Sequence, residues 1–598
     1  MNVIQGTLQL VEVGKGQALV RLIPLITALI AIIFWCDFQL YHGLDDAQSM
    51  DNAQLARQID LGRGYTTEFL RPYAITQMRD FVVGQGLTSG AARELFPSDQ
   101  FPPGKPRILP DTYNAPGYPY LLATWFYFTR PEFDQPPSAM GAVHMYSGDR
   151  LIPLLNQIFV VLTALLVFVL GLRLFDNRVA WMALIAFVAT DLVWRYAMTA
   201  LSTSVLMFLI TAAFVCVIEV FCVGEACFDS EERSFKPAWF WGLGAALLVT
   251  VACLTRLHLV VLVAPIALLL GLMPRANFFL IPAFVLVVLA LVAPWFIHMK
   301  AVCGNPLGSN TPLLLYGQDE YAENQIYCAT SIPSYERLFK DLSKKEYSGF
   351  RFHMEHAWTM LGANPLILLF AASVLHQFKR RRTRLFHWLL FSSAVVLIAA
   401  NNFCTDSPEA LGPWNVIILL FPCMLVIGSA FFFILLDRLN LQLWLINNLI
   451  ITATLILTSA PLLLTLTTST NIFYSFPPYM PPVIKQFAQF AGPDEWVTSD
   501  MPWTTAWYGD HASLWLPDSL ADFENFHDNV CPSGVLMFTP VTWSQPISMI
   551  IAGEDKDWLP LVMGLNAPPN FPLSIHTVTG PGGPDYSIWS DRPRWQGR

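Results

Sequence analysis

Long apolar stretches alternate with polar segments along most of the chain. A helix that crosses about 30 Å of hydrocarbon needs about 20 mostly apolar residues. Eleven stretches meet or approach that length: 22–40, 151–172, 178–197, 199–222, 237–255, 257–273, 277–297, 358–377, 385–402, 413–436 and 443–467. The pattern predicts a polytopic α-helical membrane protein with about eleven transmembrane helices.

Basic residues in the short loops give an orientation, because Lys and Arg in such loops stay on the cytoplasmic side. The most basic loop lies between the eighth and ninth stretches, and we assign it to the cytoplasm; it carries Lys379, Arg380, Arg381, Arg382 and Arg384. Counting spans from there places the N-terminus inside and exports the loops 41–150 and 298–357 and the segment after about 470. The first stretch lacks a small-residue cleavage site, so we expect a retained helix.

The segment 470–598 predicts a soluble, exported α/β domain that follows a transmembrane module of residues 1–469. Helical patterns at 481–491 and 547–564 alternate with strand-like runs at 495–500, 534–540 and 572–580. Alternation of this kind favours a layered sheet.

Composition agrees with a membrane protein and excludes one class of partner. With 54% hydrophobic and only 13% charged residues, the chain is too apolar for an ordinary soluble domain. A net charge of −9 and the absence of a basic stripe exclude nucleic acid as an expected partner. Ten cysteines are scattered without metal-ligand spacing. Cys303 and Cys328 share the second exported loop, where spacing alone leaves a disulfide open.

Three carboxylates stand just beyond the first apolar stretch: Asp45, Asp46 and Asp51. If residues 46–61 are helical, Asp51, Gln54 and Gln58 share one face, and the helix lies in the membrane interface with this polar face toward water. The alternative is a solvated helix beside the membrane with no further role.

Several segments, taken in order, resemble one family of membrane enzymes. The segments are "AQLAR" followed by "GRGYTT" (53–67), "PDTYNAPGYPYLLATWF" (110–126), "DRLIPLLNQIFVVLTALLVFVLGLRLF" (149–175), "TALSTSVLMFLITAAF" (199–214), "GLGAALLVTVACLTRLHLVVLV" (242–263), "APWFIHMKAVCGNPL" (293–307) and "VTSDMPWTTAWYGDHASLWLP" (497–517). Together they resemble the polyprenyl-phosphate-sugar-dependent glycosyltransferases of the GT-C superfamily. The nearest subgroup is the bacterial relatives of protein O-mannosyltransferases and of the lipid A aminoarabinose transferase.

The resemblance implies a GT-C-like fold in a bacterial inner membrane and transfer of a hexose or pentose from a lipid-linked donor at the outer face. The acceptor, whether protein, lipid or glycan, stays open. Transfer with inversion requires a carboxylate that takes the proton of the attacking hydroxyl, and Asp45, Asp46 and Asp51 are the candidates. Gln48 and Ser49 occupy the place where relatives carry an acidic pair, so the choice among the three stays open.

Cations near the exported helix ends are candidates for the donor phosphate. Arg256, Lys300 and Arg351 suit that role, with headgroup contact as the alternative for Arg256. His353 and His356 could bind a divalent metal, although two histidines alone favour hydrogen bonding. Asp111 stands near the place where relatives carry Glu-Lys, close enough to substitute for that acid, so the resemblance implies a substrate-binding role for it.

A group of aromatic and acidic residues in the tail could stack on a sugar, but packing is the favoured use: Asp500, Trp503, Trp507, Tyr508 and Asp510. The competing function is a secondary transporter or another membrane protein without enzymatic activity. Transporters tend to show internal repeats, and the sequence shows none.

Overall fold

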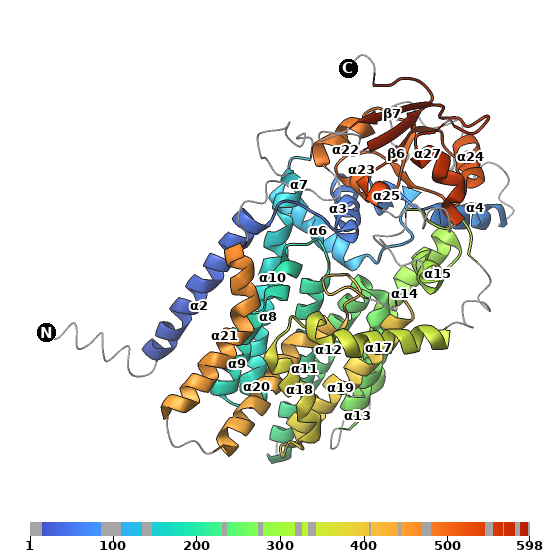
Figure 1. The fold of residues 1–598 in the computed structure, drawn as a ribbon. Coiled ribbons are helices and arrows are strands. Elements are labelled where there is room, and N and C mark those ends of the chain that lie inside the picture. The colour runs from blue at the N-terminus through green and yellow to red at the C-terminus, as the bar shows by residue number, and fades with distance from the viewer. Residues whose placement is uncertain are drawn as a thin grey trace.

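A bundle of long helices carries a mixed α/β layer at one end (Figure 1). The structure is a computed structural model of the 598-residue chain. It describes residues 15–84, 109–133, 146–229, 236–272, 279–316, 326–332, 342–405, 408–439, 444–468, 480–544, 554–565, 567–579 and 586–595.

Eight helices are long and apolar enough to cross a membrane within the described ranges. They correspond to α2 (Lys15–Trp35), continued by η1 (Cys36–Leu40), α8 (Ile152–Leu174), α11 (Thr203–Asp229), α12 (Lys236–Thr255), α14 (Leu280–Cys303), α19 (Arg381–Asn402), α20 (Phe421–Arg438), preceded by η4 (Ile417–Leu420), and α21 (Trp444–Thr468). A ninth span results if α9 (Asn177–Val188) and α10 (Asp191–Ala197), which meet at a 56° bend, are counted together.

The two remaining predicted stretches form shorter apolar helices. These are η2 (Leu257–Leu262) with α13 (Val263–Gly271), and α18 (Pro365–Ala372) with η3 (Ser373–Leu375). The stretch 358–377 is divided because Gly362 and Ala363 adopt positive φ values of 70° and 51°. Asn364 then caps α18, and the first residue of α18 is proline. Residues before this break belong to α17 (Leu342–Met360), so the eleven apolar stretches provide eight or nine full-length spans.

The first predicted exported loop folds into short helices and strands. They are α3 (Ala47–Asp60), β1 (Thr66–Thr67), β2 (Phe69–Leu70), α4 (Pro72–Gly84), β3 (Leu109–Pro110), α6 (Gly117–Thr129) and α7 (Ser147–Arg150). Asp46 caps α3 through a 2.7 Å bond from the Ser49 N–H, and Gly62 at φ 73° follows its end.

Helix α3 is enclosed by protein, which corrects the prediction of an interfacial helix with a solvated polar face. Asp51, Gln54 and Gln58 are each 0% exposed. The polar face is covered by residues from the first loop and from the C-terminal tail. In the bond from Arg57 to the Trp507 carbonyl, the two residues are 450 positions apart in the sequence. The polar residues of α3 therefore serve contacts within the protein.

The α/β layer is built on a six-stranded sheet of order β2-β5-β4-β6-β8-β7. Pairs β2·β5, β5·β4 and β4·β6 are parallel, whereas β6·β8 and β8·β7 are antiparallel. The tail contributes β4 (Trp496–Ser499), β5 (Ser513–Trp515), β6 (Ser533–Phe538), β7 (Ile575–Thr579) and β8 (Tyr586–Ser590). Its helices are α22 (Pro481–Ala488), α23 (Pro502–Trp507), α24 (Leu520–Asn529), α25 (Pro540–Ser544), η5 (Glu554–Trp558) and α27 (Leu559–Val562).

Strands β4, β6 and β7 and helix α22 agree with the predicted runs in the tail. The predicted helix 547–564 is described only in part, as η5 and α27, because residues 545–553 lie outside the described ranges. Strand β2 comes from the first exported loop and occupies one edge of the sheet. The tail and the first loop therefore build this sheet together.

The second predicted exported loop also contacts the α/β layer. The Cys328 N–H donates to the Leu516 carbonyl at 2.8 Å, and the Thr330 hydroxyl donates to Asp518 at 2.8 Å. In this loop, α15 (Asn310–Tyr316) precedes the contact. The thiols of Cys303 and Cys328 are unpaired in the structure.

Candidate active site

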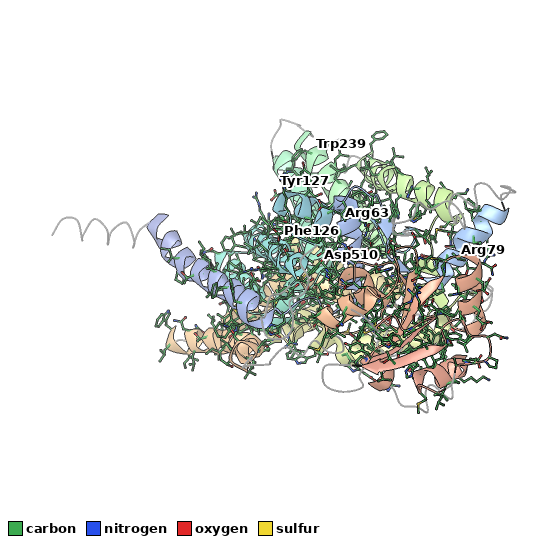
Figure 2. All side chains as sticks on the ribbon, turned by 90° about the horizontal axis from the view of Figure 1, so that it is seen from above. Arg63, Arg79, Phe126, Tyr127, Trp239 and Asp510 are labelled. Atoms are coloured by element: carbon green, nitrogen blue, oxygen red, sulfur yellow. The ribbon has the colours of Figure 1, made fainter. Side chains whose placement is uncertain are left out.

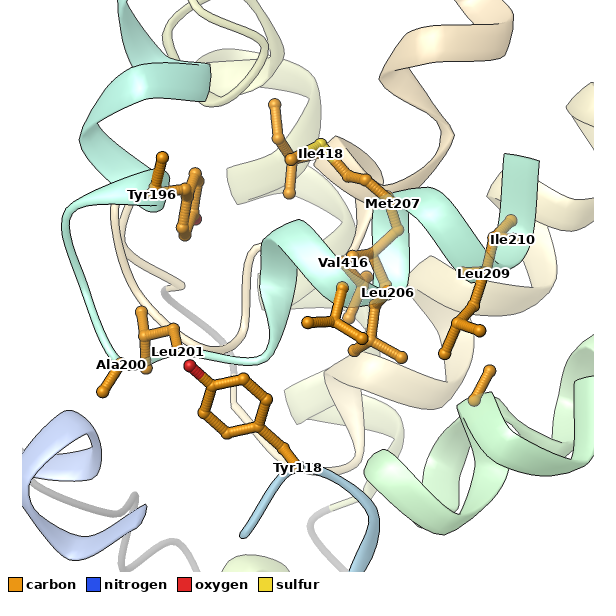
Figure 3. Close-up of a cluster of buried hydrophobic side chains, with 14 of the residues drawn as sticks. Tyr118, Tyr196, Ala200, Leu201, Leu206, Met207, Leu209, Ile210, Val416 and Ile418 are labelled. Atoms are coloured by element: carbon orange, nitrogen blue, oxygen red, sulfur yellow. The ribbon is translucent and has the colours of Figure 1, made fainter. Parts of the chain in front are cut away.

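The start of α3 is anchored to the loop between α10 and α11. The Ser49 hydroxyl accepts a 3.0 Å bond from the Ala200 N–H, and the Asn52 amide donates a 3.1 Å bond to the Ala200 carbonyl. Figure 3 shows Ala200 and Leu201 in this loop, between Tyr196 and the helix that carries Leu206. This contact fixes the position of Asp46, which caps the same first turn.

Arg256 contacts the other end of the same loop. Its Nε donates to the Ser202 hydroxyl at 3.0 Å and its Nη2 to the Thr203 hydroxyl at 3.1 Å, while Nη1 bonds the carbonyl of Pro413. A guanidinium carries five N–H donors, so these three bonds leave one donor on each terminal nitrogen. Each terminal nitrogen therefore keeps one N–H that can donate to an anion.

Asp46 is half-buried and lies within range of the Arg256 charge. Its Oδ2 accepts the bond from Ser49, and Arg256 is close enough for the two charges to interact. Burial raises the pKa of the Asp46 carboxyl to about 6, and the negative charges of Asp45 and Glu409 add to the effect. A carboxylate with such a pKa changes charge near neutral pH and suits proton transfer.

Asp51 belongs to a separate, fully buried network. Its carboxylate accepts bonds from Arg71 at 2.7 Å, from Asn114 at 2.9 Å and from Gln54 at 2.9 Å. With both oxygens held by side chains and no exposed surface, Asp51 is arranged for a structural role. Asp45, in contrast, is exposed at the protein surface.

Asp111 lies beside this network. Its Oδ2 accepts the Asn114 N–H at 2.7 Å, and its Oδ1 is 4.0 Å from Arg71 Nη1. Burial, followed by the charge of Asp51, raises the pKa of Asp111 to about 7. The Arg71 guanidinium also lies over the rings of Tyr113 and Phe69, at 3.8 and 4.0 Å from their centroids. These contacts bind the two segments of the first loop to each other.

The remaining predicted residues do not converge on Asp46 and Arg256. Lys300 is exposed on α14, and Arg351 forms a 2.7 Å surface pair with Glu355 on its own helix. His353 is buried with its Nδ1 2.7 Å from the Gly349 carbonyl.

His356 is exposed and stacks on Phe352 with ring centroids 4.1 Å apart. Its neighbour three positions earlier, His353, is 2% exposed, so the two rings do not share one site. Over the described residues, no group of three or more His, Cys, Asp or Glu side chains is arranged to hold a metal ion.

A second polar network joins α3 to the tail, and its importance was missed from the sequence. Arg57, fully buried, pairs with Glu68 at 2.7 Å and with Asp510 at 3.2 Å. Figure 2 shows Arg63 and Asp510 near the middle of the molecule in the view from above, where the first loop meets the tail. The signals in the sequence were Arg57 in the "AQLAR" segment and Asp510 in the aromatic and acidic group of the tail.

Asp149 was also missed, although Arg150 beside it marks the exported end of a predicted span. Its carboxylate accepts the Trp507 indole N–H at 2.7 Å and the Tyr508 hydroxyl at 2.8 Å. A carboxylate next to an apolar stretch, the same signal that selected Asp45 and Asp46, could have identified it. Trp507 and Tyr508 are buried in this contact.

No protein-family model and no curated protein matches the sequence of this chain. Among solved structures, the chain is similar to ArnT from Cupriavidus metallidurans in the apo state, with a TM-score of 0.54 and 11% identity over 97% of this chain and 100% of that chain. The same protein bound to undecaprenyl phosphate gives a TM-score of 0.52 and 11% identity over 96% and 98% of the two chains.

A third similar structure is the archaeal oligosaccharyltransferase AglB from Archaeoglobus fulgidus, in complex with an inhibitory peptide and a dolichol-phosphate. Its TM-score is 0.52 and its identity 9%, over 96% of this chain and 74% of that chain. The chain shares the overall fold of these structures, so the predicted polytopic helical membrane fold with a C-terminal α/β region is confirmed.

Proposed function

We propose that the chain is a membrane glycosyltransferase that moves a sugar from a polyprenyl-phosphate donor to an acceptor. The observation that carries the proposal is that loop 199–203 joins two groups. At Ala200 it bonds Ser49, in the first turn of the helix that Asp46 caps, and at Ser202 and Thr203 it bonds Arg256. The fold supports it, because the similar ArnT and AglB structures hold undecaprenyl phosphate and a dolichol-phosphate.

In this proposal Asp46 is the general base. It takes the proton of the acceptor hydroxyl while the hydroxyl oxygen forms a bond to the anomeric carbon and the bond from that carbon to the phosphate oxygen breaks. The electron pair of the broken bond leaves with the lipid phosphate. Arg256 then meets the charge that develops on the phosphate. Both exposure and contacts favour Asp46 over the buried Asp51 and the exposed Asp45.

Substitution of Arg256 tests the phosphate role. Arg256→Ala should lower turnover and raise the donor concentration needed for half-maximal transfer. The ratio of turnover to that concentration should fall by about 100- to 1,000-fold, because one strong electrostatic contact to the leaving group is lost. Arg256→Lys should retain part of the activity, since it keeps the charge but loses the paired donors. The measurement is transfer against donor concentration in membranes with matched amounts of protein.

The control for this series is Arg178→Ala. The Arg178 side chain is 61% exposed, pairs with Asp176 and Asp437 at the surface and lies 5.4 Å from the centre of the Phe433 ring. Its loss should leave donor dependence unchanged. If Arg256→Ala behaves like the control, Arg256 does not bind the donor phosphate. Lys300 and Arg351 would then be the next candidates.

The pH dependence of transfer should show an acidic limb with a midpoint near 6. Asp46 acts as a base only when ionised, and burial raises its pKa to about 6, so activity rises with pH through that value. Asp45→Asn should shift the limb toward lower pH, because a negative charge that raises the pKa of Asp46 is removed. A midpoint that does not respond to Asp45→Asn would assign the limb to another group.

We further propose that the site and the α/β layer face the exported side, with the N-terminus in the cytoplasm of a bacterial cell. The basic loop 379–384 supports this orientation, and so does the contact of all three predicted exported segments with one another at one end of the bundle (Figure 1).

Cysteine labelling in intact cells tests the orientation. Exposed positions are available on both sides, so thiols introduced as Asp45→Cys and Lys556→Cys should react with an impermeant reagent, whereas Lys379→Cys should react only after permeabilisation. The protein without an added thiol gives the background of its native cysteines. Labelling of Lys379→Cys in intact cells, with Lys556→Cys protected, would reverse the assignment.

A further inference from the structure

Three consecutive residues of the tail contact both ends of α3. Toward the end of the helix, Arg57 donates to the carbonyls of Ala506 at 2.6 Å and Trp507 at 2.8 Å. The guanidinium also lies 5.1 Å from the centre of the Trp507 ring. This end of the contact attaches the helix to the α/β layer.

At the other end, Tyr508 contacts the backbone just before the helix. The Leu44 N–H is 3.2 Å from the Tyr508 oxygen, and the hydroxyl is 3.1 Å from the Leu44 carbonyl. Leu44 stands two residues before Asp46, and both Leu44 and Tyr508 are 1% exposed. The backbone that leads into the capping residue is therefore held by a side chain from the tail, and the Asp149 carboxylate also bonds the Leu44 backbone.

Tyr508 is itself oriented by Asp149. The carboxylate accepts the Tyr508 hydroxyl on Oδ2 and the Trp507 indole on Oδ1. A hydroxyl has one proton and two acceptor sites, so Tyr508 can donate to Asp149 while it accepts from the Leu44 N–H. Gly148 is required beside this contact, because a Cβ at that position would lie 2.8 Å from the Trp507 ring.

We propose that Tyr508 is a positioning residue, through which the tail fixes the backbone at Leu44 and so holds the Asp46 carboxylate in place relative to Arg256. The proposal rests on the proposed function, in which Asp46 is the base. A displacement of about 1 Å at a reacting group can lower the rate by about 100-fold. Loss of the single Tyr508 hydroxyl should therefore lower turnover. The α/β layer is then part of the catalytic unit.

The test compares Tyr508→Phe with Tyr586→Phe. Both remove one buried hydroxyl of the α/β layer that bonds a backbone N–H, of Leu44 in the first case and of Met480 in the second. Tyr508→Phe should lower kcat by about 10- to 100-fold with an unchanged donor KM, since Arg256 is untouched. Tyr586→Phe should leave kcat near the wild-type value.

Hydrogen exchange of the peptide 41–50, followed by mass spectrometry, measures how firmly Tyr508 holds the Leu44 backbone and does not depend on enzymatic activity. Tyr508→Phe should speed exchange there and Tyr586→Phe should not. Asp149→Asn should act in the same direction as Tyr508→Phe, and the double variant should lose little more than the more affected single variant.

Unchanged exchange in Tyr508→Phe would overturn the proposal, and so would faster exchange with unchanged kcat. Equal losses of kcat in Tyr508→Phe and Tyr586→Phe would also overturn it, because both would then report general stability. If the wild-type protein transfers no sugar, the proposed function fails, while the exchange data still decide whether Tyr508 holds the segment before α3.

Discussion

Asp46→Asn should reduce transfer by about 100- to 10,000-fold, the range expected when a general base is lost. An asparagine caps a helix as well as an aspartate does, so the bond from the Ser49 N–H and the start of α3 should persist. The substitution therefore removes the proton acceptor with little change in structure. Sugar transfer per molecule of membrane-inserted protein is the measurement.

Asp45→Asn is the matched control, because it removes the neighbouring carboxylate from an exposed position. It should keep most of the activity. Asp51→Asn should instead reduce the amount of folded protein, since Arg71 would lose the partner that lies 2.7 Å away in a buried site. Wild-type transfer by Asp46→Asn would show that the base lies elsewhere.

Arg57→Ala should destabilise the folded protein by about 3–5 kcal/mol, the usual cost of removing one partner of a buried ion pair. Glu68 would remain buried, with burial raising its pKa and without the Arg57 charge that now opposes this effect. The carbonyls of Ala506 and Trp507 would also lose their donor. Thermal unfolding in detergent, followed by tryptophan fluorescence, should show the loss.

The control for Arg57 is Arg63→Ala. Arg63 contacts the same Glu68 carboxylate at 3.5 Å, but its side chain is 37% exposed, so its removal should cost less than about 1 kcal/mol. Arg57→Lys should fall between the two, because it keeps the charge and loses the forked donors. Equal unfolding temperatures for Arg57→Ala and Arg63→Ala would contradict the structural role assigned to Arg57.

The helical bundle was predictable because each apolar stretch carries its own signal. Hydrophobicity alone located each of the helices within the described ranges that are long and apolar enough to span a membrane. It could not show that Gly362 and Ala363 break the stretch 358–377. Backbone conformation at two residues decided the length of that helix. Strand β2, only two residues long, was also beyond prediction, because it becomes a strand by pairing with β5 from the distant tail.

The candidate site was predictable in its parts and not in its arrangement. Position next to apolar stretches selected Asp46 and Arg256. In the structure one loop bonds both Arg256 and Ser49, whose N–H donates to Asp46. The same signal selected Asp51, whose partners Arg71 and Asn114 are 20 and 63 positions away. Burial by distant segments distinguishes a structural carboxylate from a half-buried one, and this information is absent from local sequence patterns.

The most direct test of the central proposal uses purified protein in detergent micelles, where no compartments exist and transport cannot occur. Polyprenyl-phosphate donors carrying labelled hexoses or pentoses are mixed with heat-treated membranes as the source of acceptor, and the label remaining on the lipid is measured for wild type and Asp46→Asn. The proposal predicts that wild type moves label from at least one donor to an acceptor and that Asp46→Asn leaves it on the lipid. Label that stays on every donor with wild type, or moves equally with Asp46→Asn, would contradict it.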